Sequence, residues 1–167
     1  DTEITSKEEY VNAHLRIVED IYTRSGEIFE SDVTIKGRGN STWSLPKKPY
    51  ALKFDKKTSL LGEPKDKSWV LLANYTDKTN LRNEASFFMG RISNLEWTPR
   101  THFVELFMNE VYCGTYQLCE KIKIADSRVN ITDDGYLMEI DQPDRIGPED
   151  ISFKTKNLTF CVKDPDI

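Results

Sequence analysis

The chain has no long apolar run, few cysteines and almost no histidine. No window approaches the length of uninterrupted apolar residues that a membrane-spanning helix needs, so we expect no transmembrane segment. Three cysteines (Cys113, Cys119 and Cys161) are too few and too irregularly spaced for a disulfide framework, and no Cys/His group has the spacing of zinc ligands. The two histidines, His14 and His102, stand alone, and we expect each to be structural.

A net positive charge is also missing, because 28 acidic residues outnumber 23 Lys and Arg and leave a formal charge of -5. This balance argues against a general nucleic-acid-binding protein, which is usually basic. The charge is uneven, however: residues 36–57 are rich in Lys and Arg, and residues 133–150 are acidic. A local basic patch in an acidic protein suits a discrete anionic ligand better than a long polyanion. The alternative is an ordinary solvated charged surface.

The length of 167 residues suits one domain with a real core and is rather short for two. Alternating apolar and polar residues predict strands at 13–17, 33–36, 50–54, 103–108, 111–120, 129–131 and 136–140, with a final hairpin within 153–162. Residues 69–73 are apolar and ambiguous between strand and helix. Residues 23–31 are expected to be a connection, and 109–110 a hairpin turn. This order predicts an α+β domain with a mostly antiparallel sheet and one main helix.

That helix is predicted over about residues 78–93, with Asp77 as its N-cap. Its apolar residues recur with the spacing of an amphipathic helix and are Leu81, Ala85, Phe88 and Ile92. Arg82, Asn83 and Glu84 occupy its other faces, where side chains are usually exposed to solvent.

A glycine-rich loop joins the strand that ends near Lys36 to the strand that begins at Tyr50. It contains Gly37, Arg38, Gly39, Asn40, Ser41 and Thr42. Glycines permit sharp turns, and consecutive N–H groups in such turns bind anions. On the following strand, Lys53 shares a face with the small Ala51, as a lysine facing a ligand cleft or simply facing water would. Thr42 stands where a dinucleotide-binding loop has its third glycine, so an ordinary turn between two strands is the alternative.

Together these stretches resemble the CotH (spore coat protein H) kinase-like family. The matching stretches are 36–43 (Lys-Gly-Arg-Gly-Asn-Ser-Thr-Trp), 48–54 (Lys-Pro-Tyr-Ala-Leu-Lys-Phe), 59–62, 69–75, 77–78, 81–83, 99–100, 103–107, 114–118, 120–121 and 135–141. Their order and spacing hold over about residues 5–166.

The resemblance implies an atypical protein-kinase-like fold that binds ATP with Mg and phosphorylates Ser/Thr of proteins. It also implies extracellular, cell-surface or spore-coat settings, with protein substrates or coat proteins as partners. The loop Gly37–Thr42 would cover the phosphates, Ala51 would line the adenine, and Lys53, 14 residues after Gly39 (53 − 39), would hold the α/β-phosphates. Glu84 or Glu120 would pair with that lysine. The hinge would lie at 120–122 or 139–142, with Glu139 as a further nucleotide-site residue.

The chain contains no His-Arg-Asp or Asp-Phe-Gly string, and these carry the chemistry of protein kinases. We therefore expect a single domain, residues 1–167, that forms the N-terminal portion of such a kinase and is inactive without the second lobe. A binding or scaffold module on the same fold is the alternative function. A metal-dependent hydrolase is less well supported, since the carboxylates are scattered along loops and neither histidine has a ligand-spaced partner.

Overall fold

A computed structural model describes residues 3–18, 28–132 and 134–164. The chain divides into two compact units, Asp1–Lys121 and Ile122–Ile167. Their boundary falls within 120–122, the first of the two segments predicted as a hinge.

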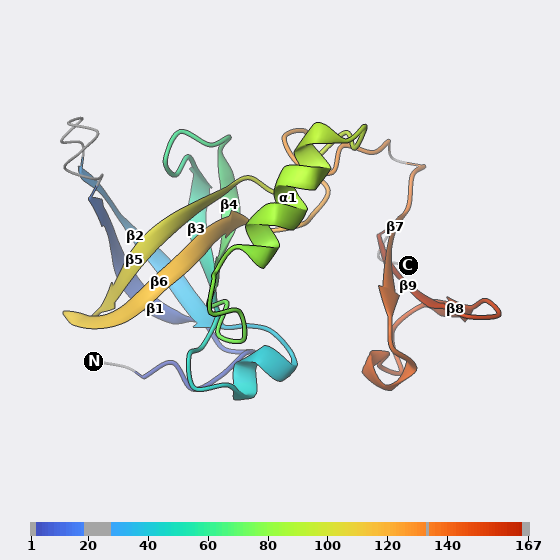
Figure 1. The fold of residues 1–167 in the computed structure, drawn as a ribbon, viewed down its shortest axis with the longest axis horizontal. Helices are drawn as coiled ribbons and strands as arrows, with labels where there is room; N and C mark the ends of the chain where they lie inside the picture. Colours follow the sequence, from blue (N-terminus) through green and yellow to red (C-terminus); the bar gives the residue numbers. More distant parts are fainter. Residues whose placement is uncertain (1–2, 19–27, 133, 165–167) are drawn as a thin grey trace. The chain divides into compact units, whose positions relative to one another are not determined.

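Six strands of the first unit form one sheet in the order β1-β2-β3-β4-β6-β5 (Figure 1). Every neighbouring pair is antiparallel, which confirms the predicted mostly antiparallel α+β architecture. The strands are β1 (Val11–Val18), β2 (Ile28–Gly37), β3 (Tyr50–Thr58), β4 (Asp66–Leu72), β5 (Thr101–Met108) and β6 (Val111–Glu120).

The core cluster of this unit lies on one face of the sheet, because its members on β2, β3, β4 and β6 are spaced two residues apart, and alternate residues of a strand share a face. Val70 and Cys119 are also buried, but they lie at the alternate positions and are not part of this cluster. The ambiguous run at 69–73 is strand as far as Leu72, because Trp69–Leu72 pair with β6 as the end of β4. Trp69 is only 1% exposed. The core cluster contains Val33, Ile35, Leu52, Phe54, Leu60, Trp69, Leu71, Ala73, Tyr116 and Leu118.

The predicted turn at 109–110 joins β5 to β6. Asn109 and Glu110 have φ of 49° and 67°. Two consecutive positive φ values match the right-handed twist of a two-stranded hairpin. The β5–β6 hairpin is therefore tight, and it brings Thr101 opposite Cys119 and Phe103 opposite Gln117.

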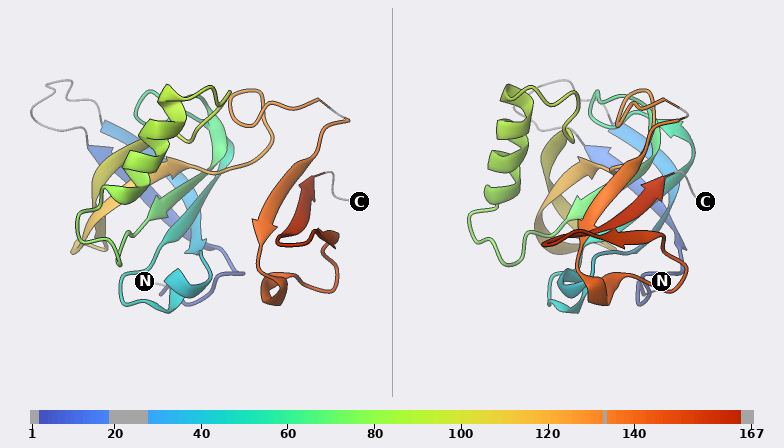
Figure 2. Two further views of the ribbon diagram at one scale, coloured as in Figure 1. Left: turned by 45° about the vertical axis from the view of Figure 1, so that its right-hand side comes forward. Right: turned by 90° about the vertical axis from the view of Figure 1, so that its right-hand side faces the viewer.

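The one α-helix in the described chain, α1 (Arg82–Ile92), follows β4 and lies along one side of the sheet (Figure 2). It begins at Arg82 rather than near 78, because the preceding residues form turns in which Asn80 has φ of 58°. The expected N-cap at Asp77 is wrong, because the N-cap of α1 is Leu81, which makes no side-chain capping bond. Asp77 lies four residues before it, and its Oδ2 accepts a hydrogen bond from the Arg82 N–H at 2.8 Å. That bond satisfies one of the donors that a helix N-terminus leaves without an intrahelical partner.

The orientation of α1 differs from the expectation for an amphipathic helix. Phe88 and Ile92, on the apolar stripe, are 52% and 62% exposed, whereas Gly90 is buried and Glu84 is half-buried. The expected solvent-facing position of Glu84 is therefore wrong. Tertiary contacts decide which side of a helix is covered, and here polar side chains of α1 find partners on the sheet.

The second unit contains a three-stranded antiparallel sheet in the order β7-β9-β8. Its strands are β7 (Leu137–Asp141), β8 (Ser152–Lys154) and β9 (Thr159–Asp164), with a short 3-10 helix, η2 (Pro143–Arg145), after β7. The predicted hairpin within 153–162 is confirmed. The strand expected at 129–131 is wrong, because only Val129 pairs there, in an isolated bridge with Ile124.

The expected connection at 23–31 is only partly described. Residues 28–31 belong to β2, and residues 23–27 lie outside the described residues. In the part of the chain that the structure describes, no helix has the length and apolar character needed to cross a membrane.

Candidate phosphate-binding pocket

The glycine-rich loop is folded around one aromatic ring. After β2 ends at Gly37, residues Ser41–Ser44 form the 3-10 helix η1, and the Trp43 ring covers Gly37 so closely that a Cβ there would lie 2.4 Å from it. Gly39 has φ of 89°, and a Cβ on it would lie 2.1 Å from Thr42 Oγ1. Both glycines are therefore required by this loop conformation.

Two lysines after η1 fasten the loop. Lys48 Nζ donates a hydrogen bond to the Trp43 carbonyl at 2.7 Å and lies 5.2 Å from the centre of the Trp43 ring. Lys47 Nζ donates to the carbonyl of Thr115 on β6 and lies 4.4 Å from the centre of the Tyr116 ring. A cation over an aromatic face is attracted by the ring quadrupole, so both lysines hold the loop against its surroundings.

This loop forms one wall of a pocket whose other wall is the segment from the end of β4 to the start of α1. The pocket has a volume of about 270 Å³. Sites for drug-sized ligands occupy about 300–1,000 Å³, so this pocket is small, with room for phosphate groups. It is lined by Arg38, Thr42, Leu45, Lys47, Pro49, Leu72, Ala73, Asn74, Tyr75, Thr76, Asp77, Arg82 and Asn83.

The lining carries three cations and one carboxylate. Burial lowers the pKa of Arg38, against a smaller opposing influence of Cys119, and burial likewise lowers the pKa of Lys47 although Glu105 and Cys113 act to raise it. Among the described residues, Arg38 makes no ion pair. A half-buried guanidinium without a carboxylate partner is favourable only if an anion or water completes its solvation.

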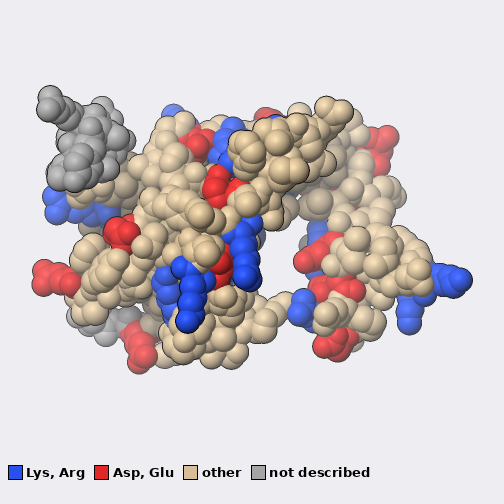
Figure 3. All heavy atoms as spheres, viewed as in Figure 1, with Lys and Arg blue, Asp and Glu red and all other residues tan. Residues whose placement is uncertain are grey.

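The one carboxylate in the lining, Asp77, already has partners. Hydrogen bonds from the Thr79 side chain, the Arg82 N–H and the Thr79 N–H lower the pKa of Asp77, and its Oδ1 lies 3.7 Å from Arg82 Nε. On the face shown in Figure 3, Lys and Arg side chains gather below α1, with acidic atoms between them. The pocket is cationic on balance.

Of the site residues predicted on the loop and on β3, only some line the pocket. Arg38 and Thr42 line the pocket, while Gly37 and Gly39 shape the loop. Asn40 and Ser41 are exposed on the loop. On β3, Ala51 is buried and Lys53 is exposed. Lys53 Nζ lies 5.8 Å from the centre of the Tyr10 ring, beside Lys36 Nζ at 4.8 Å from the same ring.

The predicted acidic residues meet other partners. Glu84 accepts hydrogen bonds from Arg91, Thr101 and Gln117. Glu120 is 1% exposed and lies 3.1 Å from Arg100 Nε. Glu139 is on β7 of the second unit, where its Oε2 lies 3.6 Å from Lys163 Nζ.

Several polar pocket residues were not singled out from the sequence as ligand contacts, among them Lys47, Asn74, Thr76, Asp77, Arg82 and Asn83. Lys47 belongs to the basic stretch 36–57, and the others lie between residues 74 and 83. The signal was present as polar residues at the end of one predicted strand and the start of the helix. The sequence around these residues does not indicate that the glycine-rich loop lies opposite them in the fold.

The residues of the pocket fit phosphate groups better than a metal ion. Arginine and lysine are the side chains that bind phosphate, one through a planar fork of donors and the other as a point charge. Within the described ranges, no group of three or more His, Cys, Asp or Glu side chains is placed to hold a metal. The lining therefore offers three cations that could hold phosphate oxygens, and Asp77 is the one carboxylate in it that could contact a metal.

Fold and pocket thus define an α+β protein with a small cationic pocket between a glycine loop and a helix N-terminus. The sequence model of the family described as CotH kinase protein matches residues 35–160, most of the chain. The chain belongs to the CotH kinase family. This family is associated with the spore coat. No curated protein matches the chain.

Proposed function

We propose that this chain supplies the phosphate-binding part of an ATP site in a CotH-type protein kinase. The observation that carries the proposal is Arg38, a half-buried cation without a carboxylate partner in a pocket that also contains Lys47 and Arg82. Bound ATP would supply the phosphoryl group. The chain's own residues would bind and orient the phosphates, with protein Ser/Thr as the acceptor. The likeness to the N-terminal lobe of a kinase is part of this proposal.

Arg38 and Lys53 are alternative phosphate contacts, and a titration separates them. The full chain is titrated with ATP·Mg²⁺ and with sodium tripolyphosphate by calorimetry, beside Arg38→Gln, Lys53→Gln and, as a matched control, the exposed Lys56→Gln. A hydrogen bond to a charged group contributes about 1.5–3 kcal/mol, so we expect Arg38→Gln to weaken binding about 10- to 100-fold. Lys56→Gln should titrate like the wild type.

Three results would lead to different conclusions. If Lys53→Gln loses affinity and Arg38→Gln does not, the phosphates lie over β3, as in the family-based expectation, and the pocket assignment is wrong. If tripolyphosphate competes with ATP·Mg²⁺ in the wild type, both occupy the same cationic pocket. If the folded wild type binds neither ligand at millimolar concentration, the nucleotide proposal fails.

A non-catalytic binding module is the second candidate function. It is favoured by the exposed apolar side chains along and after α1, among them Phe88, Met89, Ile92 and Leu95, which are 52–64% exposed. Exposed apolar patches often mark protein interaction sites. Such a module would keep the pocket as a structural feature and would ignore nucleotides in the same titration.

A further inference from the structure

A continuous chain of side-chain hydrogen bonds begins in the pocket wall and ends on the outer turns of α1. Asn83 Nδ2 donates to Asn74 Oδ1 at 2.8 Å, and Asn74 Nδ2 donates to Gln117 Oε1 at 3.2 Å. Both asparagines line the pocket. Asn74 is held in the left-handed region with φ of 48°, directly after β4.

Gln117 on β6 is the centre of this chain. Its side-chain Nε2 donates to Glu84 Oε2 at 3.0 Å and to Thr101 Oγ1 at 3.1 Å. Thr101 Oγ1 in turn donates to the same carboxylate, and Arg91 binds the other carboxylate oxygen. Gln117 is 0% exposed. Both donors of the amide and its oxygen are therefore used, and a buried amide has no water to replace a lost partner.

Phe88, Met89 and Ile92 of α1 are more than half exposed, whereas Phe87 is half-buried. The other covered residues of the helix are Glu84 and Gly90, and the exposed Asn83 is bonded to Asn74. Gly90 comes so close to Thr98 that a Cβ would lie 2.5 Å from Thr98 Oγ1. Hydrogen bonds depend steeply on geometry, so this polar network fixes the position of α1 on the sheet, together with the partial burial of Phe87.

We propose that Gln117 is a positioning residue that makes the pocket wall and helix α1 one unit. Through Asn74 it sets the pocket wall, and through Glu84 it sets the helix. A phosphate group bound against Asn74, Asn83 and Arg82 then stabilises the seating of α1, and a well-seated α1 strengthens phosphate binding, because coupling between two sites is reciprocal. Only the ligand half of this inference rests on the proposed phosphate function.

Hydrogen exchange of the full chain tests the two halves separately. The variants are Gln117→Met, which keeps the length of the side chain and removes the amide, and Thr101→Val, which removes one hydroxyl at nearly constant shape. Ser86→Ala is the matched control, because Ser86 Oγ bonds only the Arg82 carbonyl of its own helix. Circular dichroism establishes that each variant is folded, and Thr101→Val carries the test should Gln117→Met not fold.

Without ligand, we expect Gln117→Met to raise amide exchange about tenfold in both 74–81 and 82–92, and Ser86→Ala to leave both segments unchanged. Unchanged exchange in either segment would overturn the inference. With sodium tripolyphosphate, we expect slower exchange in 82–92 of the wild type. We also expect affinity to fall about five- to tenfold in Gln117→Met, within the usual range of coupling between sites.

The outcomes distinguish the inference from the proposed function. A wild type that binds no tripolyphosphate, with the ligand-free increase still present in Gln117→Met, would refute the phosphate function and support the structural unit. A wild type and a Gln117→Met variant that bind equally, with equal protection of 82–92, would refute the coupling while leaving the phosphate function intact.

Discussion

At the scale of single residues, the pocket depends on a partly buried charge and on a positive backbone φ. Each would raise the free energy of the folded state if the neighbouring residues did not stabilise it. Arg38 is a half-buried cation whose pKa burial lowers. Gly39 adopts φ of 89° against Thr42. Such features persist where the neighbouring structure determines them, and they concentrate at functional sites.

The contact of Gly39 with Thr42 leads to a prediction with a matched control. Gly39→Ala combines a positive φ with a Cβ 2.1 Å from Thr42 Oγ1, whereas Gly62→Ala has a positive φ of 81° and nothing within 4 Å of the added Cβ. Left-handed strain costs about 1–3 kcal/mol, so urea unfolding should find both variants destabilised. Tripolyphosphate affinity should fall in Gly39→Ala alone. Equal affinities would mean that the loop does not shape the site.

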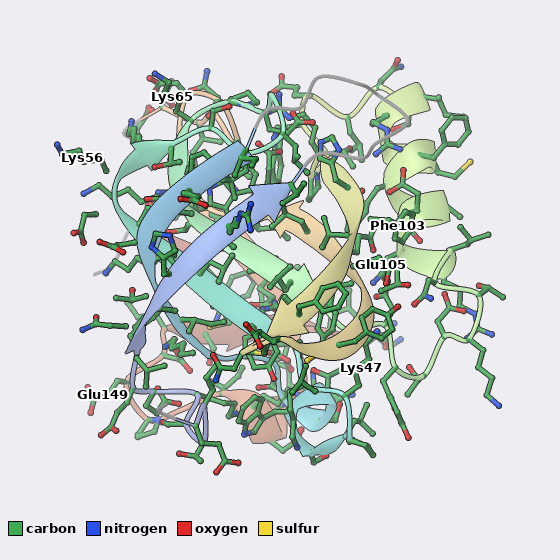
Figure 4. The ribbon with its side chains drawn as sticks, turned by 90° about the vertical axis from the view of Figure 1, so that its left-hand side faces the viewer. Lys47, Lys56, Lys65, Phe103, Glu105 and Glu149 are labelled. Carbon is green, nitrogen blue, oxygen red and sulfur yellow. The ribbon has the colours of Figure 1, made fainter. Side chains whose placement is uncertain are left out.

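At the scale of elements, helix α1 is attached to the sheet by a carboxylate. Burial alone would raise the pKa of Glu84, but hydrogen bonds from Thr101, Arg91 and Gln117, with the charge of Arg91, outweigh it and lower the pKa below 4.5. Thr101 lies on β5 and Gln117 on β6, so the bonds to Glu84 reach both strands of the hairpin. Phe103 and Glu105 of β5 also lie on the side of the hairpin toward α1 (Figure 4). The helix and the β5–β6 hairpin are therefore joined by polar contacts.

Acidification should loosen this attachment. Because the folded-state pKa of Glu84 lies below its ordinary value of 4.5, its stabilising contribution is complete above about pH 4.5 and is lost as the pH falls through the folded pKa. Unfolding free energy measured from pH 7 to pH 3 should therefore fall less steeply in Glu84→Gln than in the wild type. The exposed Glu96→Gln is the control and should follow the wild-type curve. Parallel curves for all three proteins would show that Glu84 does not contribute.

At the scale of the whole molecule, the large apolar core belongs to the first unit. All ten buried residues of the core cluster lie on β2, β3, β4, β6 and the segments next to β3 and β4. The second unit has a smaller sheet with Met138, Ile140 and Phe153 exposed. The sequence predicts a single domain. That prediction holds only if the two units unfold together.

A core substitution answers that question. Leu52 is 3% exposed, and removing a buried leucine side chain costs about 2–5 kcal/mol. Leu52→Ala should therefore raise hydrogen exchange throughout β2–β6. If the units are independent, exchange in β7–β9 will equal that of the wild type. A parallel increase in β7–β9 would instead establish one cooperative domain.

Much of the architecture was predictable because it depends on local patterns. Period-two alternation located most strands of both sheets, and the turn at Asn109–Glu110 follows from residue types whose preferences act over a few positions. The family, too, was predictable, since its motifs are contiguous strings such as residues 36–43.

The candidate site was predictable only in part. Arg38 and Thr42 were identified from the loop, whereas Lys47, Asn74, Arg82 and Asn83 were not. The pocket forms because the loop between β2 and β3 lies against the segment that follows β4, and this arrangement depends on the order of the strands in the sheet. The spacing of residues in the sequence does not predict that order.

By itself, then, the sequence determined the strands, the existence of the helix, the glycine loop and the family, because each arises from interactions among neighbours along the chain. Tertiary structure decided which face of α1 meets the sheet and which cations share a pocket. An amphipathic pattern predicts that an apolar face will be buried, but the buried partners of Glu84 lie on β5 and β6. Contacts between residues distant in sequence carry the free energy that decides between these orientations.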